Sequence, residues 1–146
     1  MVNIIADIWG GMPRMAHSGA ARTGMLSFPG IAECAHSHAA VPVNAVAPGW
    51  IVSSGFDTYT PKAQKEMHDW KKRVSLQRFD TEAEISAAIV FLLSEAASFI
   101  TGSCMRIDGD RPNARHTWAL IPHQRAKPFE GFPLATRPES QTVQDK

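Results

Sequence analysis

Four residues near the start of the chain have side chains that could do chemistry together. Asp7, His17, Ser18 and Arg22 follow an apolar run, and open α/β sheets bind ligands beyond the carboxyl ends of their strands. Ser18 and Arg22 are four positions apart, so on a helix they share a face. A capping or buried serine beside a solvated arginine explains the same pattern without a ligand, and from the residues alone that interpretation is the stronger one.

A second group is the histidine pair at positions 36 and 38. Imidazole nitrogens bind metals, but side chains two positions apart diverge on a helix, and no third ligand is fixed nearby in the sequence. We therefore interpret His36 and His38 as surface residues and predict no metal site.

The third group is Pro48-Gly49 with two tryptophans. Pro48-Gly49 directly follows an apolar stretch and in isolation is typical of a plain turn. Trp50 and Trp70 could stack on a ligand, although a large aromatic side chain more often belongs to a core or an interface. None of the three groups assigns a reaction by itself.

Composition limits the classes of protein and partner. The chain has 146 residues, of which 44% are hydrophobic and 20% charged, a size and composition typical of one globular domain. A formal net charge of +1 leaves no overall field to attract nucleic acid or an anionic membrane. Cys34 and Cys104 are too few for a disulfide framework or a zinc cluster. The longest apolar run, residues 87–93, is far shorter than the roughly 20 residues of a membrane span, so we predict a soluble, cytoplasmic protein.

The first half of the sequence predicts two buried strands separated by helix. Residues 1–9 have the apolar, partly β-branched pattern of a strand that is covered on both faces. Residues 13–28 favour a helix, which Pro29-Gly30 should kink or end; residues 31–40 could resume it. Residues 41–47 predict the second buried strand.

The second half begins with a polar loop that reaches Pro61, followed by a short amphipathic helix over residues 63–74. A capping box of Thr81 and Glu84 then starts the clearest helix, whose buried stripe comprises Ile85, Ala88, Ile89 and Leu92. Residues 103–107 predict a last strand. This order of elements indicates an α/β fold with at least three strands.

Beyond the last strand the composition changes. Residues 111–146 contain five of the ten prolines and only scattered apolar anchors, namely Trp118, Phe129, Phe132 and Leu134. We predict a domain over residues 1–110 and a proline-rich extended tail over residues 111–146, which wraps a neighbouring surface or is partly disordered.

Four sequence blocks, in order, are VNIIAD, SGAARTGM, VNAVAPGWIVSS and QRFDTEAEISAAIVFLLSEAASFITGSCMRIDG. Together they resemble the carboxyl-terminal half of the short-chain dehydrogenases/reductases over residues 2 to 110. The last two blocks are the specific ones. Within the family, the chain is most similar to the branch of 2,4-dienoyl-CoA reductases, peroxisomal trans-2-enoyl-CoA reductases and citronellol dehydrogenase-like enzymes.

The resemblance implies a Rossmann-like doubly wound parallel sheet, of which only the second half is present. It also implies an oxidoreductase that uses NAD or NADP and passes hydride to or from an enoyl-CoA, aldehyde or alcohol with an apolar chain. The expected partners are a small-molecule substrate such as an acyl-CoA or terpenoid and further copies of the chain, with no nucleic acid and no membrane.

Cofactor-binding residues follow from the same resemblance. Pro48 and Gly49 would line the nicotinamide site, and the backbone of Ile51 would bind the carboxamide. Ser53 stands where the family usually has a threonine.

Two catalytic positions depart from the usual pattern. Arg22 matches the lysine that holds the ribose hydroxyls, and Ser18 matches the tyrosine that donates the proton. An aliphatic hydroxyl cannot be tuned to a working pH as a phenol can, whereas arginine keeps a fixed charge and its donors. We therefore expect these two departures to preserve ribose binding better than proton delivery. Reduction of an enoyl thioester depends less on a proton from Ser18.

The family's glycine-rich turn, which seats the pyrophosphate on a helix N-terminus, has no counterpart in these 146 residues. Family members run to about 250 residues, enough for a whole Rossmann sheet. We therefore weigh an alternative function, in which the chain is a non-catalytic truncated remnant or an oligomerisation module that lacks the pyrophosphate site.

Overall fold

The computed structural model describes residues 1–111, 120–129 and 131–132. The chain divides into two compact units. Unit 1 comprises Met1–Pro48 and Ile85–Ile107, and unit 2 comprises Gly49–Glu84 and the described residues from Asp108 onward. Each unit has a parallel sheet of its own.

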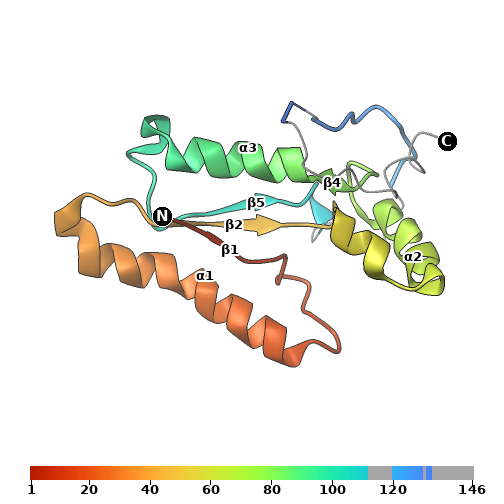
Figure 1. Ribbon diagram of the computed structural model, residues 1–146, viewed down its shortest axis with the longest axis horizontal. Coiled ribbons are helices and arrows are strands. Elements are labelled where there is room, and N and C mark those ends of the chain that lie inside the picture. The colour runs from red at the N-terminus through yellow and green to blue at the C-terminus, as the bar shows by residue number, and fades with distance from the viewer. Residues whose placement is uncertain (112–119, 130, 133–146) are drawn as a thin grey trace. The chain divides into compact units, whose positions relative to one another are not determined.

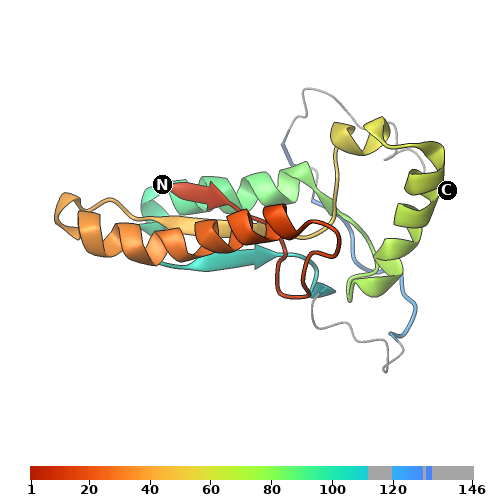
Figure 2. The same cartoon turned by 90° about the horizontal axis from the view of Figure 1, so that it is seen from below.

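Unit 1 contains a three-stranded sheet in the order β1-β2-β5. Its strands are β1 (Val2–Ile4), β2 (Asn44–Pro48) and β5 (Cys104–Ile107), and α1 (Ala16–His36) connects β1 to β2. Figures 1 and 2 show α1 on one face of the sheet and α3 (Glu82–Leu93) on the other. This confirms the α/β fold that the order of elements predicted and the doubly wound arrangement that the family resemblance implied.

The core of unit 1 lies between β2 and α3. Val46, at the centre of β2, is fully buried and packs with Leu92 and Ala97. Full burial of such a valine contributes about 1.5–3 kcal/mol. Partly buried residues complete the cluster, namely Val2, Ala88, Ile89, Ile100, Met105 and Ile107. The second buried strand, predicted over residues 41–47, is confirmed as β2, although it starts at Asn44.

A buried asparagine joins β2 to the turn before β5. The Asn44 side chain donates from Nδ2 to the Ile100 carbonyl at 2.6 Å and accepts at Oδ1 from the Ser103 amide at 3.1 Å. These two bonds satisfy the amide in a place where an unpaired polar group would cost about 1–3 kcal/mol. The side chain thus ties the start of β2 to the chain that leads into β5.

Helix α1 contains a proline in its interior. Of the two predicted effects of Pro29-Gly30, an end of the helix is wrong, because α1 continues to His36. Proline removes one helical hydrogen bond and clashes with the preceding turn. The side chain of Pro29 is fully buried and Ala32, one turn on, is also buried, so packing of this face offsets the local cost.

Unit 2 pairs two short strands, β3 (Ile51–Val52) and β4 (Asp80–Thr81). Between them lie α2 (Pro61–His68) and a 3-10 turn over residues 69–73. The hydroxyl of Thr60 accepts from the Ala63 amide at 3.3 Å, and Pro61 occupies the first turn, where its missing N–H costs nothing. The sequence placed β3 inside a polar loop, which is wrong.

The predicted capping box at the start of α3 is confirmed. The Thr81 amide donates to Glu84 Oε2 at 3.0 Å, and the Glu84 amide donates to the Thr81 hydroxyl at 3.3 Å. The two residues satisfy each other's free backbone donors, as this motif does at helix N-termini.

Other expectations have mixed outcomes. The last predicted strand is confirmed as β5, whereas the first is only three residues long instead of spanning 1–9. In the described part of the chain both cysteines are free, and no helix is long and apolar enough to cross a bilayer. Phe129 and Phe132 meet edge to face, with ring centroids 5.7 Å apart. Two of the predicted tail anchors, Trp118 and Leu134, lie outside the described residues.

Candidate functional site

Arg22 is bound to the carboxyl end of β1. Its Nη1 donates to the Ile4 carbonyl at 2.9 Å and to the Ile5 carbonyl at 3.2 Å. The interpretation of Arg22 as a merely solvated side chain is therefore wrong. Ser18 lies one turn earlier on α1 and is half-buried.

The carboxyl ends of β1 and β2 lie together in unit 1. Beyond β1 the ladder continues, because the Ile5 amide donates to the Val46 carbonyl at 2.9 Å and the Asp7 amide to the Pro48 carbonyl at 3.0 Å. Arg22, Asp7 and Pro48 thus share the edge of the sheet at which α/β proteins bind ligands.

Gly49 lies in a tight backbone contact within unit 2. A Cβ atom at this position would stand 2.7 Å from the Cα atom of Asp108 and 3.0 Å from Asp80 Oδ2. No larger residue fits without a shift of the Asp108 backbone. Gly49 is thus more than the plain turn residue that its sequence context favours.

The backbone N–H and C=O of Ile51 lie on the side of β3 that faces away from β4. Ile51 lies opposite Asp80, and the Asp80 amide donates to the Trp50 carbonyl at 2.9 Å. In a parallel ladder a residue bonds to the two neighbours of the residue opposite it, so the N–H and C=O of Ile51 point away from β4. Among the described residues no strand pairs with that side of β3. The exposed donor and acceptor can bind a planar amide.

Ser53 precedes a 3-10 turn over Ser54–Thr58. Its carbonyl accepts from the Phe56 amide at 2.8 Å, which starts the turn. The Ser53 side chain is half-buried and makes no capping hydrogen bond, so its hydroxyl is not committed to the turn.

A buried carboxyl group lies beside Gly49. Burial raises the pKa of Asp80 to about 7, and the negative charges of Glu84 and Asp108 act in the same direction, against Arg78 and the Gly49 amide. Oδ2 of Asp80 is buried and has no hydrogen-bond partner among the described residues. With 7% of its surface exposed, Asp80 is a structural group. The sequence analysis missed it, and an acidic residue directly before the capping Thr81 was the available signal.

Arg78 and Glu84 form a half-buried ion pair. Arg78 donates to both carboxylate oxygens, at 2.7 and 2.5 Å, and each side chain is only 16% exposed. Burial pushes the pKa of Glu84 upward, but the hydrogen bonds from Arg78 and the Thr81 amide outweigh it, so the pKa is lowered. The pair therefore stays charged at neutral pH.

The two tryptophans contact each other. The ring centroids of Trp50 and Trp70 are 4.9 Å apart, and the Arg111 guanidinium lies 4.7 Å from the centroid of Trp50. These contacts within unit 2 favour packing over ligand stacking. In the described part of the chain no group of His, Cys, Asp or Glu could hold a metal ion; the side chain of His36 is outside it.

The predicted site residues fall into two sets. Ser18, Arg22 and Pro48 belong to unit 1, whereas Gly49, Ile51 and Ser53 belong to unit 2. Within unit 1 the structure brings Arg22 and Pro48 to the same sheet edge, and within unit 2 it brings Gly49 and Ile51 to the β3-β4 pair.

Known proteins are similar to the segment of this chain that contains the predicted site residues. A family described as enoyl-(acyl carrier protein) reductase matches residues 5–109. A probable 2,4-dienoyl-CoA reductase of Bacillus subtilis (strain 168) is 37% identical over 102 residues, which cover 69% of this chain and 40% of that protein. A 3-oxoacyl-[acyl-carrier-protein] reductase of Staphylococcus aureus (strain Mu50) is 30% identical over 99 residues, which cover 68% of this chain and 39% of that protein. The chain thus spans about two fifths of the length of these curated relatives.

Two solved structures are similar as well. A citronellol catabolism dehydrogenase of Pseudomonas aeruginosa PAO1 is 50% identical, with a TM-score of 0.60 over 76% of this chain and 41% of that one. A 4-hydroxyisoleucine dehydrogenase complexed with NADH is 26% identical, with a TM-score of 0.66 over 78% of this chain and 47% of that one.

Proposed function

We propose, from the premise that the chain belongs to the short-chain dehydrogenase/reductase family, that it supplies the nicotinamide-binding half of an NAD(P)-dependent oxidoreductase. Its reaction transfers hydride to or from an enoyl-CoA, an aldehyde or an alcohol with an apolar chain. A bound nicotinamide supplies or accepts the hydride, and the residues of this chain orient it.

The observation that carries the proposal is the open edge of β3. The N–H and C=O of Ile51 face away from β4, directly after the Pro48-Gly49 turn, and a carboxamide offers the matching acceptor and donor. Ser53, whose hydroxyl makes no capping bond, lies two residues further on. These residues fit the nicotinamide end of the cofactor.

The pyrophosphate end of the cofactor does not fit the residues present. The sequence has no glycine-rich turn for it. Arg22, the residue expected at the ribose, already donates from Nη1 to the Ile4 and Ile5 carbonyls. We therefore assign this chain only the contacts to the nicotinamide ring and its carboxamide.

Ser18 supports an enoyl thioester as the substrate class. A serine hydroxyl is too weak an acid to deliver the proton that carbonyl reduction needs, whereas hydride transfer to an enoyl thioester requires donors that stabilise an enolate. The similarity to a 2,4-dienoyl-CoA reductase and to a citronellol catabolism dehydrogenase supports an acyl thioester or a terpenoid as substrate.

Fluorescence titration of NADH and NADPH against the purified chain, at two protein concentrations, tests the proposal. We expect saturable binding at micromolar concentrations. The Ile51→Pro variant should lose it, because proline removes an N–H that does not belong to the β3-β4 ladder. Ile51→Val keeps the N–H and serves as the matched control. Absence of saturable binding, or equal binding by both variants, would overturn the proposal.

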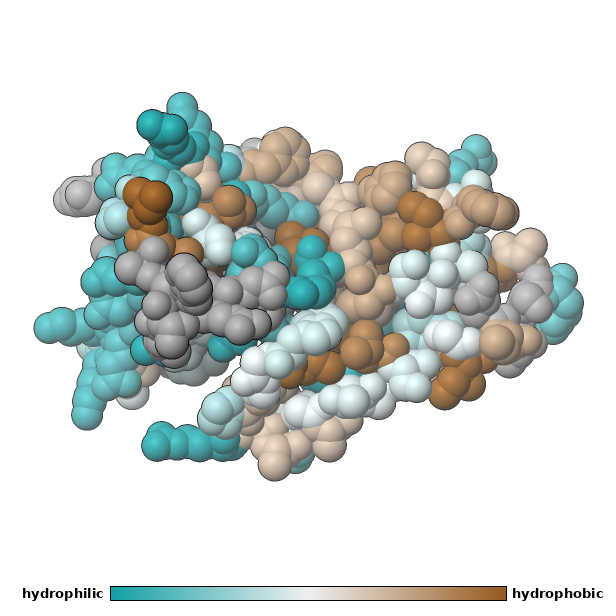
Figure 3. All heavy atoms as spheres, turned by 180° about the vertical axis from the view of Figure 1, so that it is seen from behind, coloured by the Kyte–Doolittle hydropathy of each residue, from teal (hydrophilic) through white to brown (hydrophobic). Residues whose placement is uncertain are grey.

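A second candidate function is a non-catalytic oligomerisation module. In unit 1, Val90 is 55% exposed, Leu93 62%, and Phe99 is fully exposed; exposed apolar clusters of this kind mark interaction sites. Figure 3 shows apolar residues interspersed with polar ones on the face of the molecule seen from behind. Further copies of the chain are the proposed partners.

Sedimentation velocity tests this second candidate. A Leu93→Lys, Phe99→Ser variant should be monomeric at concentrations where the unchanged chain associates. A Val41→Ser variant removes a similarly exposed apolar side chain elsewhere in unit 1 and should associate normally. A monomeric unchanged chain would refute the module.

A further inference from the structure

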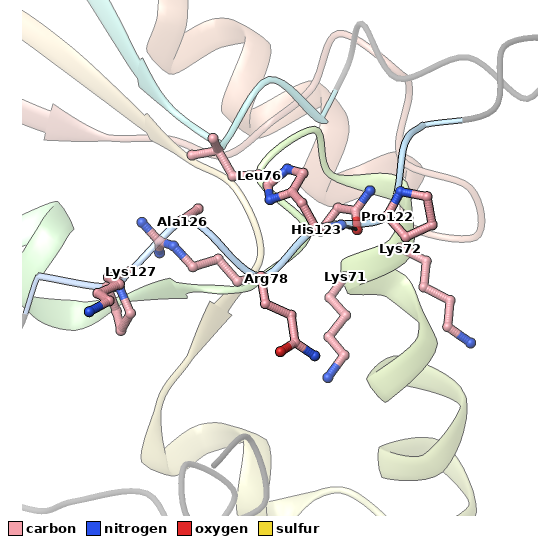
Figure 4. Close-up of a pocket in the computed structure, with 11 residues that line it drawn as sticks. Lys71, Lys72, Leu76, Arg78, Pro122, His123, Ala126 and Lys127 are labelled. Carbon is pink, nitrogen blue, oxygen red and sulfur yellow. Dashed lines mark hydrogen bonds between the residues drawn. The ribbon is translucent and has the colours of Figure 1, made fainter. Parts of the chain in front are cut away.

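Unit 2 contains a cavity of about 700 Å³ that none of the predicted site residues lines. Eleven residues form its walls, and they come from positions 71–72, 76–78 and 122–128. Figure 4 shows the contribution of the last stretch, with His123, Ala126 and Lys127 facing side chains from the two earlier ones.

Hydrogen bonds hold the last stretch in place. Gln77 donates from Nε2 to the Ile121 carbonyl at 2.9 Å and accepts at Oε1 from the His123 amide at 3.0 Å. Nε2 of His123 lies 3.0 Å from the Ser75 carbonyl, so it donates to that oxygen. Further along, the Thr81 hydroxyl donates to the Phe129 carbonyl at 3.0 Å. These bonds anchor the last stretch to residues 75–81.

The walls are cationic. Lys71, Lys72, Arg78 and Lys127 line the cavity, and its described lining residues include no aspartate or glutamate. In a chain with a formal net charge of +1, this is a local concentration of positive charge, which raises the local concentration of anions.

Two of the four cations are neutralised and two are not. Lys72 pairs with Asp69 at 2.7 Å and Arg78 pairs with Glu84. Lys71 and Lys127 form no ion pair with any carboxylate in the described part of the chain. A ligand would supply the countercharge for these two ammonium groups.

The cations are spread around the cavity. In Figure 4, Lys127 lies on one side of the cavity, with Lys71 and Lys72 on the other. A chain of linked phosphates carries charge along its length and can therefore contact cations on opposite sides of a cavity. Lysine is a common phosphate ligand because it acts as a point charge with three donors.

We propose that this cavity binds an extended polyphosphate, with Lys71 and Lys127 as its charge partners. The phosphate chain can come from inorganic polyphosphate or from a nucleoside polyphosphate. The proposal does not depend on the oxidoreductase function, because it concerns different residues and predicts binding by the chain alone.

Isothermal titration calorimetry of the full chain with inorganic phosphate, pyrophosphate, triphosphate, ADP and adenosine tests the proposal and separates the two sources. We expect triphosphate to bind, and to bind at least tenfold more tightly than inorganic phosphate. Adenosine should not bind. If ADP binds more tightly than pyrophosphate, the nucleoside contributes; equal affinities assign the site to the phosphates.

Charge reversal locates the site. Lys71→Glu and Lys127→Glu should each weaken triphosphate binding about tenfold, the size expected for one charge-assisted contact. Lys62→Glu, an exposed lysine of α2 that does not line the cavity, is the matched control and should bind normally. Circular dichroism checks folding, and Lys127→Gln, which changes an exposed side chain, should reproduce the loss if charge reversal disturbs the fold. Equal binding by all variants, or no binding of triphosphate, would refute the site.

Discussion

The backbones of Gly49 and Asp108 touch, since a Cβ atom on Gly49 would stand 2.7 Å from the Cα atom of Asp108. We predict that Gly49→Ala lowers the free energy of unfolding by about 2 kcal/mol, the usual cost of inserting a methyl group into a packed site. Urea denaturation measures the change.

Gly30 provides the control for that substitution. It lies within α1, and nothing stands within 4 Å of a Cβ placed there. Gly30→Ala should raise the free energy of unfolding by about 0.5–1 kcal/mol, because alanine favours helix over glycine. Equal effects at Gly30 and Gly49 would contradict the contact with Asp108.

The second prediction concerns Asp80. Its pKa rises from 3.8 to about 7 on folding, so between these pH values the folded chain holds a proton that the unfolded chain has released. The free energy of unfolding should therefore fall as pH rises from about 4 to about 7. The fall is on the order of 2–4 kcal/mol, from about 1.4 kcal/mol per pKa unit.

Asp80→Asn removes this titration. Asparagine stays neutral, so the variant should be more stable than the unchanged chain at pH 8 and similar to it at pH 4. Urea denaturation at several pH values gives both curves. Parallel curves would show that Asp80 does not titrate in this range.

The third prediction concerns the ion pair of Arg78 and Glu84. Glu84→Gln leaves the half-buried guanidinium without its countercharge, and we expect a loss of about 3 kcal/mol in the free energy of unfolding. The measurement belongs at pH 5, where Asp80 is protonated and Glu84 is ionised. Because folding lowers the pKa of Glu84 below its ordinary value of 4.5, its contribution is present above that pH and is lost as the pH falls through the folded pKa.

The exposed pair of Asp69 and Lys72 offers a comparison. Its side chains are 66% and 73% exposed, and such pairs contribute little to stability. Asp69→Asn should leave denaturation unchanged. A loss as large as that of Glu84→Gln would mean that burial does not distinguish the two pairs.

The fourth prediction concerns Arg22. Arg22→Met keeps the aliphatic stem but removes the donors to the Ile4 and Ile5 carbonyls, and we expect a loss of about 1–2 kcal/mol. Hydrogen exchange at the Ile5 and Asp7 amides, which bond to β2, should become faster. Arg22→Lys keeps the charge and should lose less. Unchanged exchange in Arg22→Met would contradict its role at the end of β1.

Local sequence signals predicted the elements that depend on neighbours along the chain. The capping box of Thr81 and Glu84 and the apolar run of β2 were both identifiable, because cap geometry and burial leave marks within a few residues. Two-residue β3 leaves no such mark, since its pairing with β4 depends on residues far along the chain.

The sequence predicted which positions belong to the candidate site, but not the contacts or orientations of those residues. The family resemblance pointed to Ile51, but the direction of its N–H follows from its register against Asp80. The partner of Arg22 and the packing of Gly49 on Asp108 are also contacts between distant residues. The burial of Asp80 depends on tertiary packing, so its raised pKa has no signature in the sequence.

The proline within α1 changes what stabilises the last turns of this helix. Pro29 has no amide hydrogen, so the carbonyl of Met25 lacks its usual donor, and the hydrogen-bonded ladder is interrupted there. The turns that follow persist because Pro29 and Ala32 are buried, and not through helix propensity. An excised peptide of residues 16–36 would therefore lose its helix after Pro29. The last turns of α1 form only when the rest of unit 1 packs against them.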